Sequence, residues 1–410
     1  MNEYPRWHAD SVKDALKSRR VVIISGARQT GKTTLAKEVM DKDSIFMPLD
    51  KKSIRAAALD DPTGFVKNEK GTMVIDEIQK APDLIPEIKY VVDNNNRPGQ
   101  YLLTGSANIQ SLPSVSESLA GRVKNLHLRP LTQGEILRQK PTFLKKAFDR
   151  DFPKQITGYD KDKIFDLAFR GGYPEAVSYS TQTAVKDWHN DYIDTLIKRD
   201  LKDVANIKRQ NALRELIGIL ASWSGKFMDI PPICTSLGLS KPTVETYINA
   251  LETLYLFEKV PAWTKTDYGR IGRSPKIFAA DTGLMTSVLR WNKKEVMLNT
   301  DRAGKLAETF VFQELAAQVD LDAAYSLYQY RDRRDREIDF LIEREDGALI
   351  GVEVKAGHNV SKSDFTPQIW FRDNIIKGKK AYTGYVMYSG EDVLQFGEDM
   401  IAIPTASLWQ

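Results

Sequence analysis

A chain of 410 residues is long enough for two or three domains, each with its own core. It carries 59 Lys and Arg against 55 Asp and Glu, a formal net charge of +4, so charge alone does not indicate a nucleic-acid-binding protein. A single cysteine, Cys234, excludes an internal disulfide and a cysteine-rich zinc cluster, and no apolar run approaches the roughly 18 residues of a membrane span. Because the N-terminus also lacks the pattern of a signal peptide, we expect a cytoplasmic protein with no membrane partner.

The first motif lies in VVIISGARQTGKTTLAKEVM, residues 21–40, where a buried-type strand is followed by a helical pattern. The pattern G-x-x-x-x-G-K-[ST] is met at Gly26, Gly31, Lys32 and Thr33. In such a loop the glycines let backbone N–H groups wrap the phosphates, the lysine reaches the β and γ phosphates, and the hydroxyl ligates magnesium. The sequence therefore predicts a site for ATP and Mg²⁺. Its nucleotide-binding residues are Gly26, Ala27, Arg28, Gln29, Thr30, Gly31, Lys32, Thr33 and Thr34.

Two acids follow the next buried-type strand, residues 72–75. In P-loop enzymes the first acid at such a strand end, here Asp76, holds magnesium, and the next, here Glu77, can orient or deprotonate the attacking water. Two consecutive acids can also simply begin a helix. After a phosphate-binding loop the catalytic interpretation is favoured, and Glu77 then predicts hydrolysis.

Two further candidates lie downstream of these acids. The strand at residues 100–103 runs into a polar turn, Thr104 to Asn108, in which Ser106 is the candidate sensor of the γ-phosphate; a plain Gly-Ser turn is the alternative. Arg122 precedes a strand at residues 123–128, from which its guanidinium can reach a phosphate bound to a neighbouring subunit; a surface arginine is the alternative. The predicted catalytic residues are Lys32, Glu77, Ser106 and Arg122.

Several segments together resemble the bacterial and archaeal AAA+ family ATPases that carry a C-terminal DUF4143 domain. They are GARQTGKTTL, TMVIDEIQKAP, YLLTGSAN and SLAGRVKNLHLRPLTQGEIL. The resemblance continues in RGGYPEAV (residues 170–177), in W-x-x-x-Y-I-x-T-L-I-K-R-D-L from Trp188, and in KIFAADTGL (residues 276–284). It covers nearly the whole chain, and it implies an AAA-like ATP site together with a DNA-associated activity.

The middle of the chain is helical in pattern. Residues 131–209 are expected to form a lid or connector, and from residue 210 three short helices precede a strand near residues 257–261, the order of a winged helix. The third helix has Ser240 at its N-cap position. Lys241, Thr243 and Lys259 are the candidate DNA contacts. Alternatively, the winged helix packs on the ATPase ring as a structural element and does not contact DNA. Basic runs end at Arg20, Arg209 and Arg336; such runs are usually solvated faces, and DNA contact is the second interpretation.

REIDFLIEREDGALIGVEVKAG, residues 336–357, predicts a hairpin that keeps charges inside its strands. Glu353 and Lys355 share a face because strand side chains alternate, and Asp339 on the partner strand can join them. A cross-strand ion pair on a solvated face is the plain interpretation. In the preceding helix, AGKLAETFVFQELAAQV, the carboxylate of Glu308 lies among apolar residues and needs a partner or a metal.

This order of a helix with Glu308, a strand with Asp339 and a strand with Glu353-Val354-Lys355 resembles the PD-(D/E)XK nuclease fold. The resemblance implies a metal site at Glu308, Asp339, Glu353 and Lys355, in which carboxylates hold magnesium and the lysine positions the water. Ile338 stands where that motif has proline, so the motif is less diagnostic. Domains of this fold also serve in DNA binding without cleavage.

The predicted fold is α/β with four parts. They are an AAA-like P-loop domain with a parallel sheet (1–130), a helical lid or connector (131–209), a winged helix (210–262) and a nuclease-like α/β domain (263–410). The predicted function is an Mg²⁺-dependent ATPase that works as a homo-oligomer, a hexameric ring, to remodel branched or broken DNA, with DNA cleavage as a further activity. A nucleotide-controlled switch that recognises a partner protein in signalling or defence is the alternative, and a structure-selective endonuclease whose assembly is set by ATP is a third interpretation.

Overall fold

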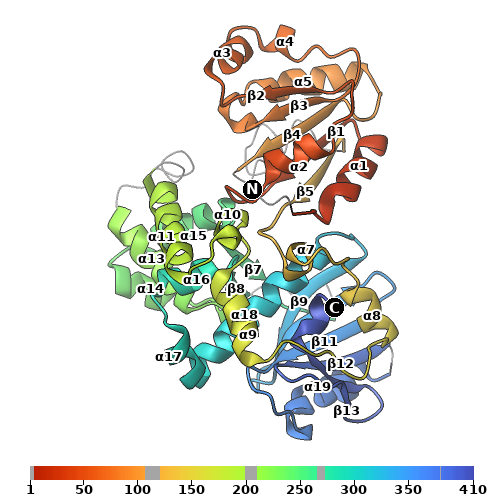
Figure 1. The fold of residues 1–410 in the computed structure, drawn as a ribbon, viewed down its shortest axis with the longest axis vertical. Helices are drawn as coiled ribbons and strands as arrows, with labels where there is room; N and C mark the ends of the chain where they lie inside the picture. Colours follow the sequence, from red (N-terminus) through yellow and green to blue (C-terminus); the bar gives the residue numbers. More distant parts are fainter. Residues whose placement is uncertain (1–3, 107–120, 199–209, 266–272, 379) are drawn as a thin grey trace. The chain divides into compact units, whose positions relative to one another are not determined.

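The computed structural model describes residues 4–106, 121–198, 210–265, 273–378 and 380–410 (Figure 1). Contacts divide the chain into two compact units. The N-terminal unit consists of Glu3–Pro130 with Glu252–Tyr255, and the C-terminal unit contains Leu131–Leu251 and Leu256–Gln410. The predicted nucleotide site therefore belongs to the first unit and the predicted carboxylate site to the second.

The N-terminal unit is built on a parallel five-stranded sheet, which confirms the predicted α/β class. Its strands are β1 (Val21–Ser25), β2 (Ile45–Pro48), β3 (Met73–Asp76), β4 (Tyr101–Gly105) and β5 (Val123–His127). They lie in the order β2-β3-β4-β1-β5, and every neighbouring pair is parallel. The helices are α1 (His8–Ser18), α2 (Lys32–Glu38), α3 (Lys52–Asp60), α4 (Pro62–Phe65) and α5 (Leu84–Asn94), with a 3₁₀ turn η1 (Ile78–Lys80) after β3.

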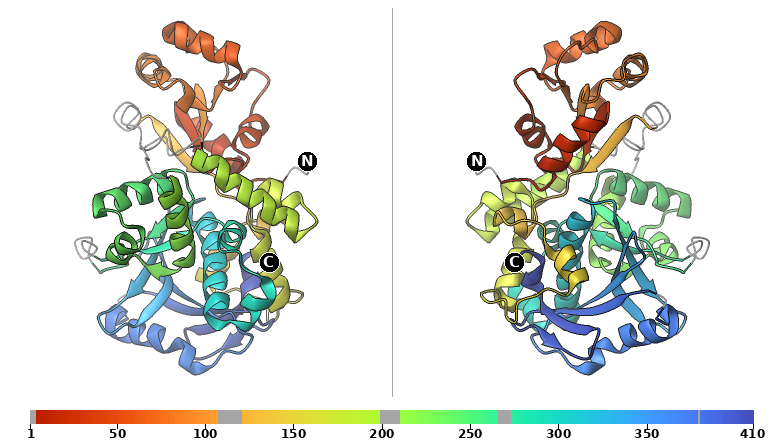
Figure 2. Two further views of the ribbon diagram at one scale, coloured as in Figure 1. Left: turned by 90° about the vertical axis from the view of Figure 1, so that its left-hand side faces the viewer. Right: turned by 90° about the vertical axis from the view of Figure 1, so that its right-hand side faces the viewer.

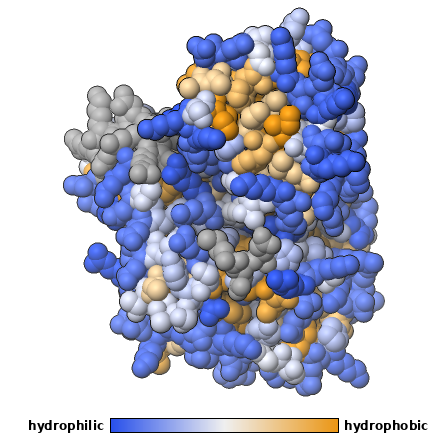
Figure 3. Space-filling model, turned by 45° about the horizontal axis from the view of Figure 1, so that its top comes forward, coloured by the Kyte–Doolittle hydropathy of each residue, from blue (hydrophilic) through white to orange (hydrophobic). Residues whose placement is uncertain are grey.

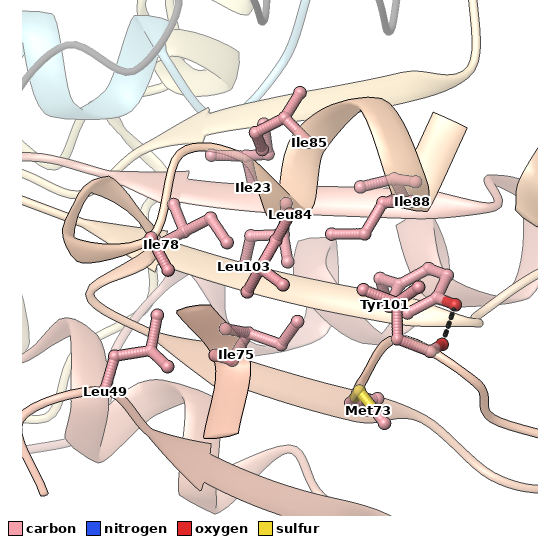
Figure 4. Close-up of a cluster of buried hydrophobic side chains, with 14 of the residues drawn as sticks. Ile23, Leu49, Met73, Ile75, Ile78, Leu84, Ile85, Ile88, Tyr101 and Leu103 are labelled. Carbon is pink, nitrogen blue, oxygen red and sulfur yellow. Dashed lines mark hydrogen bonds between the residues drawn. The ribbon is translucent and has the colours of Figure 1, made fainter. Parts of the chain in front are cut away.

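The two faces of this sheet bury different helices because strand side chains alternate. Val21 and Ile23 of β1 point to the face that packs against α5, in the cluster that Figure 4 shows. Val22 and Ile24 point to the opposite face, which packs against α1 and α2. β1, β3 and β4 are buried along their whole length and begin as continuous apolar runs, which is why they could be predicted from the sequence. β2, with exposed and half-buried residues, was not predicted.

The C-terminal unit begins with helices and a small sheet. The helices are α7 (Gln133–Ile136), α8 (Phe143–Asp149), α9 (Lys161–Arg170), α10 (Pro174–Ser178), α11 (Gln182–Lys198), α13 (Gln210–Ser222), α14 (Ile230–Leu237), α15 (Lys241–Thr253), α16 (Thr282–Val288), α17 (Lys293–Leu298) and α18 (Thr300–Val319). Strands β6 (Lys226–Phe227), β7 (Phe257–Val260) and β8 (Lys276–Ala279) form an antiparallel sheet in the order β6-β8-β7. This sheet includes β8, which lies beyond residue 262, where the sequence places the end of a winged-helix domain. Because a long connection separates β7 from β8, the sequence did not indicate that these two strands pair.

A six-stranded mixed sheet completes the C-terminal unit. Its strands are β9 (Tyr325–Arg331), β10 (Glu337–Arg344), β11 (Leu349–Val354), β12 (Tyr382–Tyr388), β13 (Leu394–Gln395) and β14 (Met400–Pro404), in the order β13-β14-β12-β11-β10-β9. β10 and β11 form the antiparallel hairpin that the sequence predicts, with Phe340 opposite Val352. Helix α18 packs against β9 and β11 (Figure 2), and α19 (Thr366–Phe371) packs against β10.

Helix α18 carries buried polar side chains that bind other segments of the same unit. Gln318 accepts a hydrogen bond from the backbone N–H of Phe143 at 3.2 Å and donates to the Leu408 carbonyl at 2.9 Å. The fully buried carboxylate of Glu314 accepts from the backbone N–H of Gln133, at the start of α7, at 2.9 and 3.2 Å. Residues that follow the N-terminal unit in sequence are thereby held in the C-terminal unit.

The burial of Glu314 predicts a pH-dependent stability. Burial raises the pKa of Glu314 to about 8, although the hydrogen bond from Gln133 opposes the shift. Since this folded-state pKa lies above the ordinary value of 4.5, the protonated carboxyl favours folding at low pH, and its contribution is lost as the pH rises toward 8. Glu314→Gln keeps an acceptor oxygen but cannot ionise. We expect the free energy of unfolding of the variant, relative to the wild type, to rise by on the order of 3 kcal/mol between about pH 5 and about pH 8.

Urea unfolding at the two pH values measures this difference. Glu295→Gln is the control, because that carboxylate is exposed and paired with Arg302 at 3.4 Å. A difference between Glu314→Gln and the wild type that stays constant with pH would contradict the prediction.

Polar residues cover most of the surface in view in Figure 3. Within the described residues, no helix has the length and apolar character needed to cross a membrane.

Candidate functional site

The phosphate-binding loop joins β1 to α2 in the N-terminal unit. Its backbone requires glycine: Gly26 has φ +153°, and a Cβ there would lie 2.2 Å from the carbonyl oxygen of Leu128. Gly31, with φ +96°, precedes the first residue of α2. The buried Lys32 donates from Nζ to the carbonyl oxygens of Gly26 at 3.0 Å and Ala27 at 2.7 Å. The lysine ammonium therefore lies directly over the loop.

Sheet order brings the magnesium-binding candidates together. β4 lies between β1 and β3, so the carboxyl ends of these three parallel strands meet at one edge. Thr33 Oγ1 lies 2.9 and 3.1 Å from the two carboxylate oxygens of Asp76. Thr104, at the end of β4, donates to Asp76 Oδ1 at 2.6 Å and accepts from the Glu77 backbone N–H at 3.1 Å. A hydroxyl and a carboxylate at this position are the hard oxygen donors that Mg²⁺ prefers, so these residues fit the ion.

Glu77 has left-handed backbone dihedrals, φ 62° and ψ 49°, directly after β3. Its Oε2 accepts from Gln79 Nε2 and from Ser106 Oγ, the latter at 3.3 Å. Gln79 Nε2 also donates to Ser106 Oγ at 3.0 Å. The structure thus places Ser106 beside the candidate base, whereas Thr104 is the residue that contacts Asp76. Asn108, in the same predicted turn, lies outside the described residues.

The remaining loop residues differ in exposure and in contacts. Thr30 is fully buried, Arg28 half-buried, and Gln29 and Thr34 exposed. The sequence did not point to Arg6, whose guanidinium donates to the carbonyl of Thr30 and, at 2.7 Å, to that of Arg129. An arginine so far from the loop in sequence gives no local signal.

Arg122 directly precedes β5, so it lies at the amino edge of the parallel sheet, whereas the phosphate-binding loop follows the carboxyl end of β1. Its Nε forms an ion pair with Asp93 near the end of α5. The structure therefore does not bring Arg122 to the phosphate-binding loop of its own subunit.

The candidate DNA contacts lie on α15 and β7. Lys241 is exposed and lies 3.8 Å from Glu245, a weak surface pair. Thr243 shares a hydrogen bond of 2.8 Å with Ser240, the predicted N-cap residue, and Lys259 is half-buried on β7. The basic run that ends at Arg209 lies outside the described residues.

In the C-terminal unit, a lysine ammonium lies among the predicted metal ligands. Lys276 Nζ, on β8, is 2.7 Å from Glu308 Oε1 and 3.0 Å from Asp339 Oδ1, and it also contacts Glu337. The Lys276 side chain is only 1% exposed. Gly225 leaves room for this arrangement, since a Cβ there would lie 2.7 Å from Glu308 Oε2. Within the described residues, no group of three or more His, Cys, Asp or Glu side chains is arranged to hold a metal ion.

Glu353 and Lys355 form a neighbouring pair at 3.2 Å, and Asp339 Oδ2 accepts from the Val354 backbone N–H at 2.9 Å. Burial and the charge of Asp339 raise the pKa of Glu353 to about 8. The same two causes raise the pKa of Glu308 well above its ordinary value. Burial works to lower the pKa of Lys276, but the nearby carboxylates raise it well above its ordinary value. An ammonium thus supplies the positive charge that the sequence assigned to a metal.

The motifs RGGYPEAV and KIFAADTGL meet at a buried carboxylate. Asp281 accepts from the backbone N–H groups of Gly172 at 2.6 Å and Leu284 at 2.7 Å, and so caps α16. A Cβ on Gly171 would lie 2.4 Å from Asp281 Oδ1. Burial raises the pKa of Asp281 to about 6. Because these motif residues pack against one another, they hold α9, α10 and α16 together.

The parallel sheet, the phosphate-binding loop and the two acids at the end of β3 define an AAA-type P-loop domain. Family models agree with this class and extend it: an AAA domain matches residues 18–137, a domain of unknown function, DUF8612, matches residues 161–295, and another, DUF4143, matches residues 303–408. The chain combines an AAA-type domain with a C-terminal DUF4143 domain, which confirms the resemblance seen in the sequence motifs.

Two relatives share most of this chain. An uncharacterized protein of Mycobacterium tuberculosis is 28% identical over 399 residues, which cover 97% of this chain and 82% of that protein. An uncharacterized protein of Haemophilus influenzae is 24% identical over 367 residues, covering 84% of this chain and 85% of the relative.

Solved structures show more distant likenesses. A Signal Transduction ATPase with Numerous Domains (STAND) protein of Pyrococcus horikoshii has 14% identity and a TM-score of 0.26, over 77% of this chain and 46% of that one, so this chain spans about half its length. RuvB of Thermotoga maritima has 17% identity and a TM-score of 0.24, over 65% of this chain and 91% of that one. TM-scores this low do not establish a shared arrangement over those lengths.

Proposed function

We propose that the N-terminal unit binds ATP with Mg²⁺ and hydrolyses it, and that hydrolysis drives remodelling of DNA bound to the C-terminal unit. The observation that carries the ATPase proposal is the contact of Thr33 with Asp76 at 2.9 and 3.1 Å, directly beside Lys32 in the phosphate-binding loop. A hydroxyl and a carboxylate held together at the end of such a loop are the ligands that a nucleotide-bound magnesium takes.

Each residue has a distinct role in this proposal. Lys32 binds the β and γ phosphates, and Thr33 and Asp76 hold Mg²⁺. When bound, Mg²⁺ neutralises charge on the phosphate oxygens. Glu77 accepts a proton from the attacking water, and Ser106 holds the Glu77 carboxylate through the 3.3 Å hydrogen bond. Thr104 fixes Asp76 and the Glu77 backbone together.

Arg122 acts, in this proposal, on the nucleotide of a neighbouring subunit. It lies at the amino edge of the sheet, away from the phosphate-binding loop of its own subunit, so its guanidinium can stabilise γ-phosphate charge only in an assembly. This role is why we propose a homo-oligomer, with a hexameric ring as its form.

DNA binding is assigned to the C-terminal unit, through a winged helix formed by α13, α14, α15 and the sheet β6-β8-β7. Lys241, Thr243 and Lys259 are its proposed contacts. Cleavage is not part of the proposal, because Lys276 lies between Glu308 and Asp339 where a metal would have to bind. The unit retains the order of elements of a nuclease-like domain and uses it for binding.

The steady-state ATPase rate with and without DNA tests this function. We expect linear duplex, single-stranded or four-way-junction DNA to raise the rate about tenfold, a coupling of about 1.4 kcal/mol, with Lys32→Ala as the blank. Lys241→Ala combined with Lys259→Ala should raise the DNA concentration that gives half-maximal stimulation, because DNA binds more weakly. The basal ATPase rate should stay the same. A response that is flat for every DNA form would contradict the proposal and favour a nucleotide-controlled switch that acts on a partner protein.

A further inference from the structure

A basic pocket lies between the small sheet and the six-stranded sheet of the C-terminal unit. It has a volume of about 420 Å³, within the size range of small-molecule sites. Its lining includes three guanidinium groups, those of Arg273, Arg331 and Arg333, together with Phe227 and Gln329. Arg331 and Arg333 belong to the basic run that ends at Arg336. No role in the ATPase site uses any of these residues.

The walls of the pocket are fixed by backbone contacts between the two sheets. The Trp263 backbone N–H donates to the Gln329 carbonyl at 2.7 Å, and the Gln329 N–H donates to the Pro261 carbonyl at 2.9 Å. Arg273 donates from Nη1 to the Arg331 carbonyl at 3.0 Å. A site with walls held in this way needs little rearrangement to receive a ligand.

Asp332, the acid that lines the pocket, does not cancel the positive charge of the three guanidinium groups. Asp332 accepts from Arg336 Nε at 2.7 Å and from the backbone N–H groups of Arg334 and Arg336 at 2.8 and 3.1 Å. Burial works to raise the pKa of Asp332, but these hydrogen bonds lower it below its ordinary value. The Asp332 carboxylate is thus already paired with Arg336. Arg331 is paired with Asp335, which is 75% exposed, so water screens that pair.

Arg333 and Gln329 offer unused hydrogen-bonding capacity. Arg333 is exposed, and among the described residues its guanidinium has no hydrogen bond or ion pair. Gln329 is 1% exposed, and its Nε2 donates to the Ser274 carbonyl at 3.3 Å. Because a carbonyl only accepts, that bond fixes the orientation of the amide and leaves Oε1 buried without a donor. A buried acceptor without a partner costs free energy that a ligand with a donor group would recover.

The pocket adjoins the carboxylate cluster through Phe227. The Arg331 guanidinium lies 4.6 Å from the centre of the Phe227 ring, and Lys276 Nζ lies 5.7 Å from it. Glu337 of β10 lies opposite Arg331 of β9 in the strand register, and its carboxylate contacts Lys276. The cations that an anion in the pocket would meet are therefore the three arginines that line it, and the Phe227 ring, in contact with both Arg331 and Lys276, marks the border with the carboxylate cluster.

We propose that this pocket binds a backbone phosphate of DNA, with Arg273, Arg331 and Arg333 as its ligands and Gln329 as acceptor for an amino group of a neighbouring base. Guanidinium groups bind phosphate oxygens in a bidentate manner, and the buried Gln329 Oε1 can accept from a donor on the base next to that phosphate. This inference rests on the proposed DNA function and names a second contact region besides α15.

The test is fluorescence anisotropy of a labelled four-way junction and a labelled duplex, titrated with the full chain between about 50 and 200 mM salt. We expect Arg331→Gln with Arg333→Gln to weaken binding about tenfold and to reduce the slope of log affinity against log salt by about one per lost phosphate contact. The matched control is Arg344→Gln. Its guanidinium also lies 4.6 Å from an aromatic ring, that of Phe148, and is paired with the acid Asp346, but it does not line the pocket.

Each outcome decides a separate point. If the wild type binds DNA and the double variant binds equally well with the same salt slope, the pocket inference is wrong and the proposed function stands. If the wild type binds no DNA form at low salt, both are wrong. Arg333→Gln alone guards against misfolding, because that side chain is exposed. It should still weaken binding several-fold, and urea unfolding followed by tryptophan fluorescence confirms that each variant is folded.

Discussion

Replacing Glu77 by Gln is expected to lower the steady-state rate of ATP hydrolysis by about 10²–10⁴-fold, the contribution of a general base. The variant can retain the hydrogen bonds from Gln79 and Ser106, because an amide oxygen can still accept from both side chains. Lys32, Thr33 and Asp76 are untouched, so ATP binding should be retained. Phosphate release measures the first effect, and titration with a fluorescent ATP analogue measures the second.

Two further variants make that result specific. Lys32→Ala should lose both binding and hydrolysis, since it removes the ammonium that lies over the loop at 2.7 and 3.0 Å from backbone carbonyls. Glu87→Gln is the matched control, because that half-buried carboxylate on α5 accepts from Thr63 at 2.9 Å and has no role in the nucleotide site. If the hydrolysis rate of Glu77→Gln lies within threefold of the wild-type rate, Glu77 is not the general base, whether or not the variant still binds ATP.

The nucleotide site could be predicted in large part from the sequence because its signals are local. Gly26 and Lys32 lie at the two ends of one short motif, and Asp76 is the last residue of a fully buried strand. Thr104 could be placed at a strand end, but its bond to Asp76 depends on β4 lying between β1 and β3, which no local pattern specifies. Arg6 precedes α1, and both α1 and β1 separate it from the loop in the sequence, so only the folded chain brings it to Thr30.

The carboxylate cluster shows the same limit more clearly. Period-two alternation predicted the hairpin and the proximity of Glu353 to Lys355, and burial in the helix pointed to Glu308. Lys276 was missed, although it begins an otherwise apolar strand in KIFAADTGL and so carries the same signal that marked Asp339: a charge kept inside a buried strand. Opposite charges on separate strands can be paired only when the topology is known, so a metal was the simplest partner that the sequence offered.

Replacing Lys276 by Met is expected to lower the free energy of unfolding by about 3–5 kcal/mol, the usual cost of removing one partner of a buried ion pair. The change would leave Glu308, Glu337 and Asp339 without the ammonium that now contacts all three. The loss should be larger at about pH 8 than at about pH 5, because protonation of the carboxyls at low pH removes the repulsion. Urea unfolding followed by tryptophan fluorescence measures it. Lys293→Met is the control, since that lysine also contacts two acids, Asp162 and Asp166, but these are 65% and 53% exposed.

Divalent cations then distinguish an ammonium site from a metal site. Three converging carboxylates are ligands for hard cations, so millimolar Mg²⁺ or Mn²⁺ should restore part of the stability that Lys276→Met loses and should leave the wild-type stability unchanged. An Asp76→Asn background removes the other expected magnesium site from both proteins. If Mg²⁺ stabilises the wild type as much as the variant, a metal binds beside Lys276, and the metal-dependent nuclease site that the sequence predicts becomes the better account of Glu308 and Asp339. If it stabilises only the variant, the tethered ammonium of Lys276 is what keeps this carboxylate cluster free of metal.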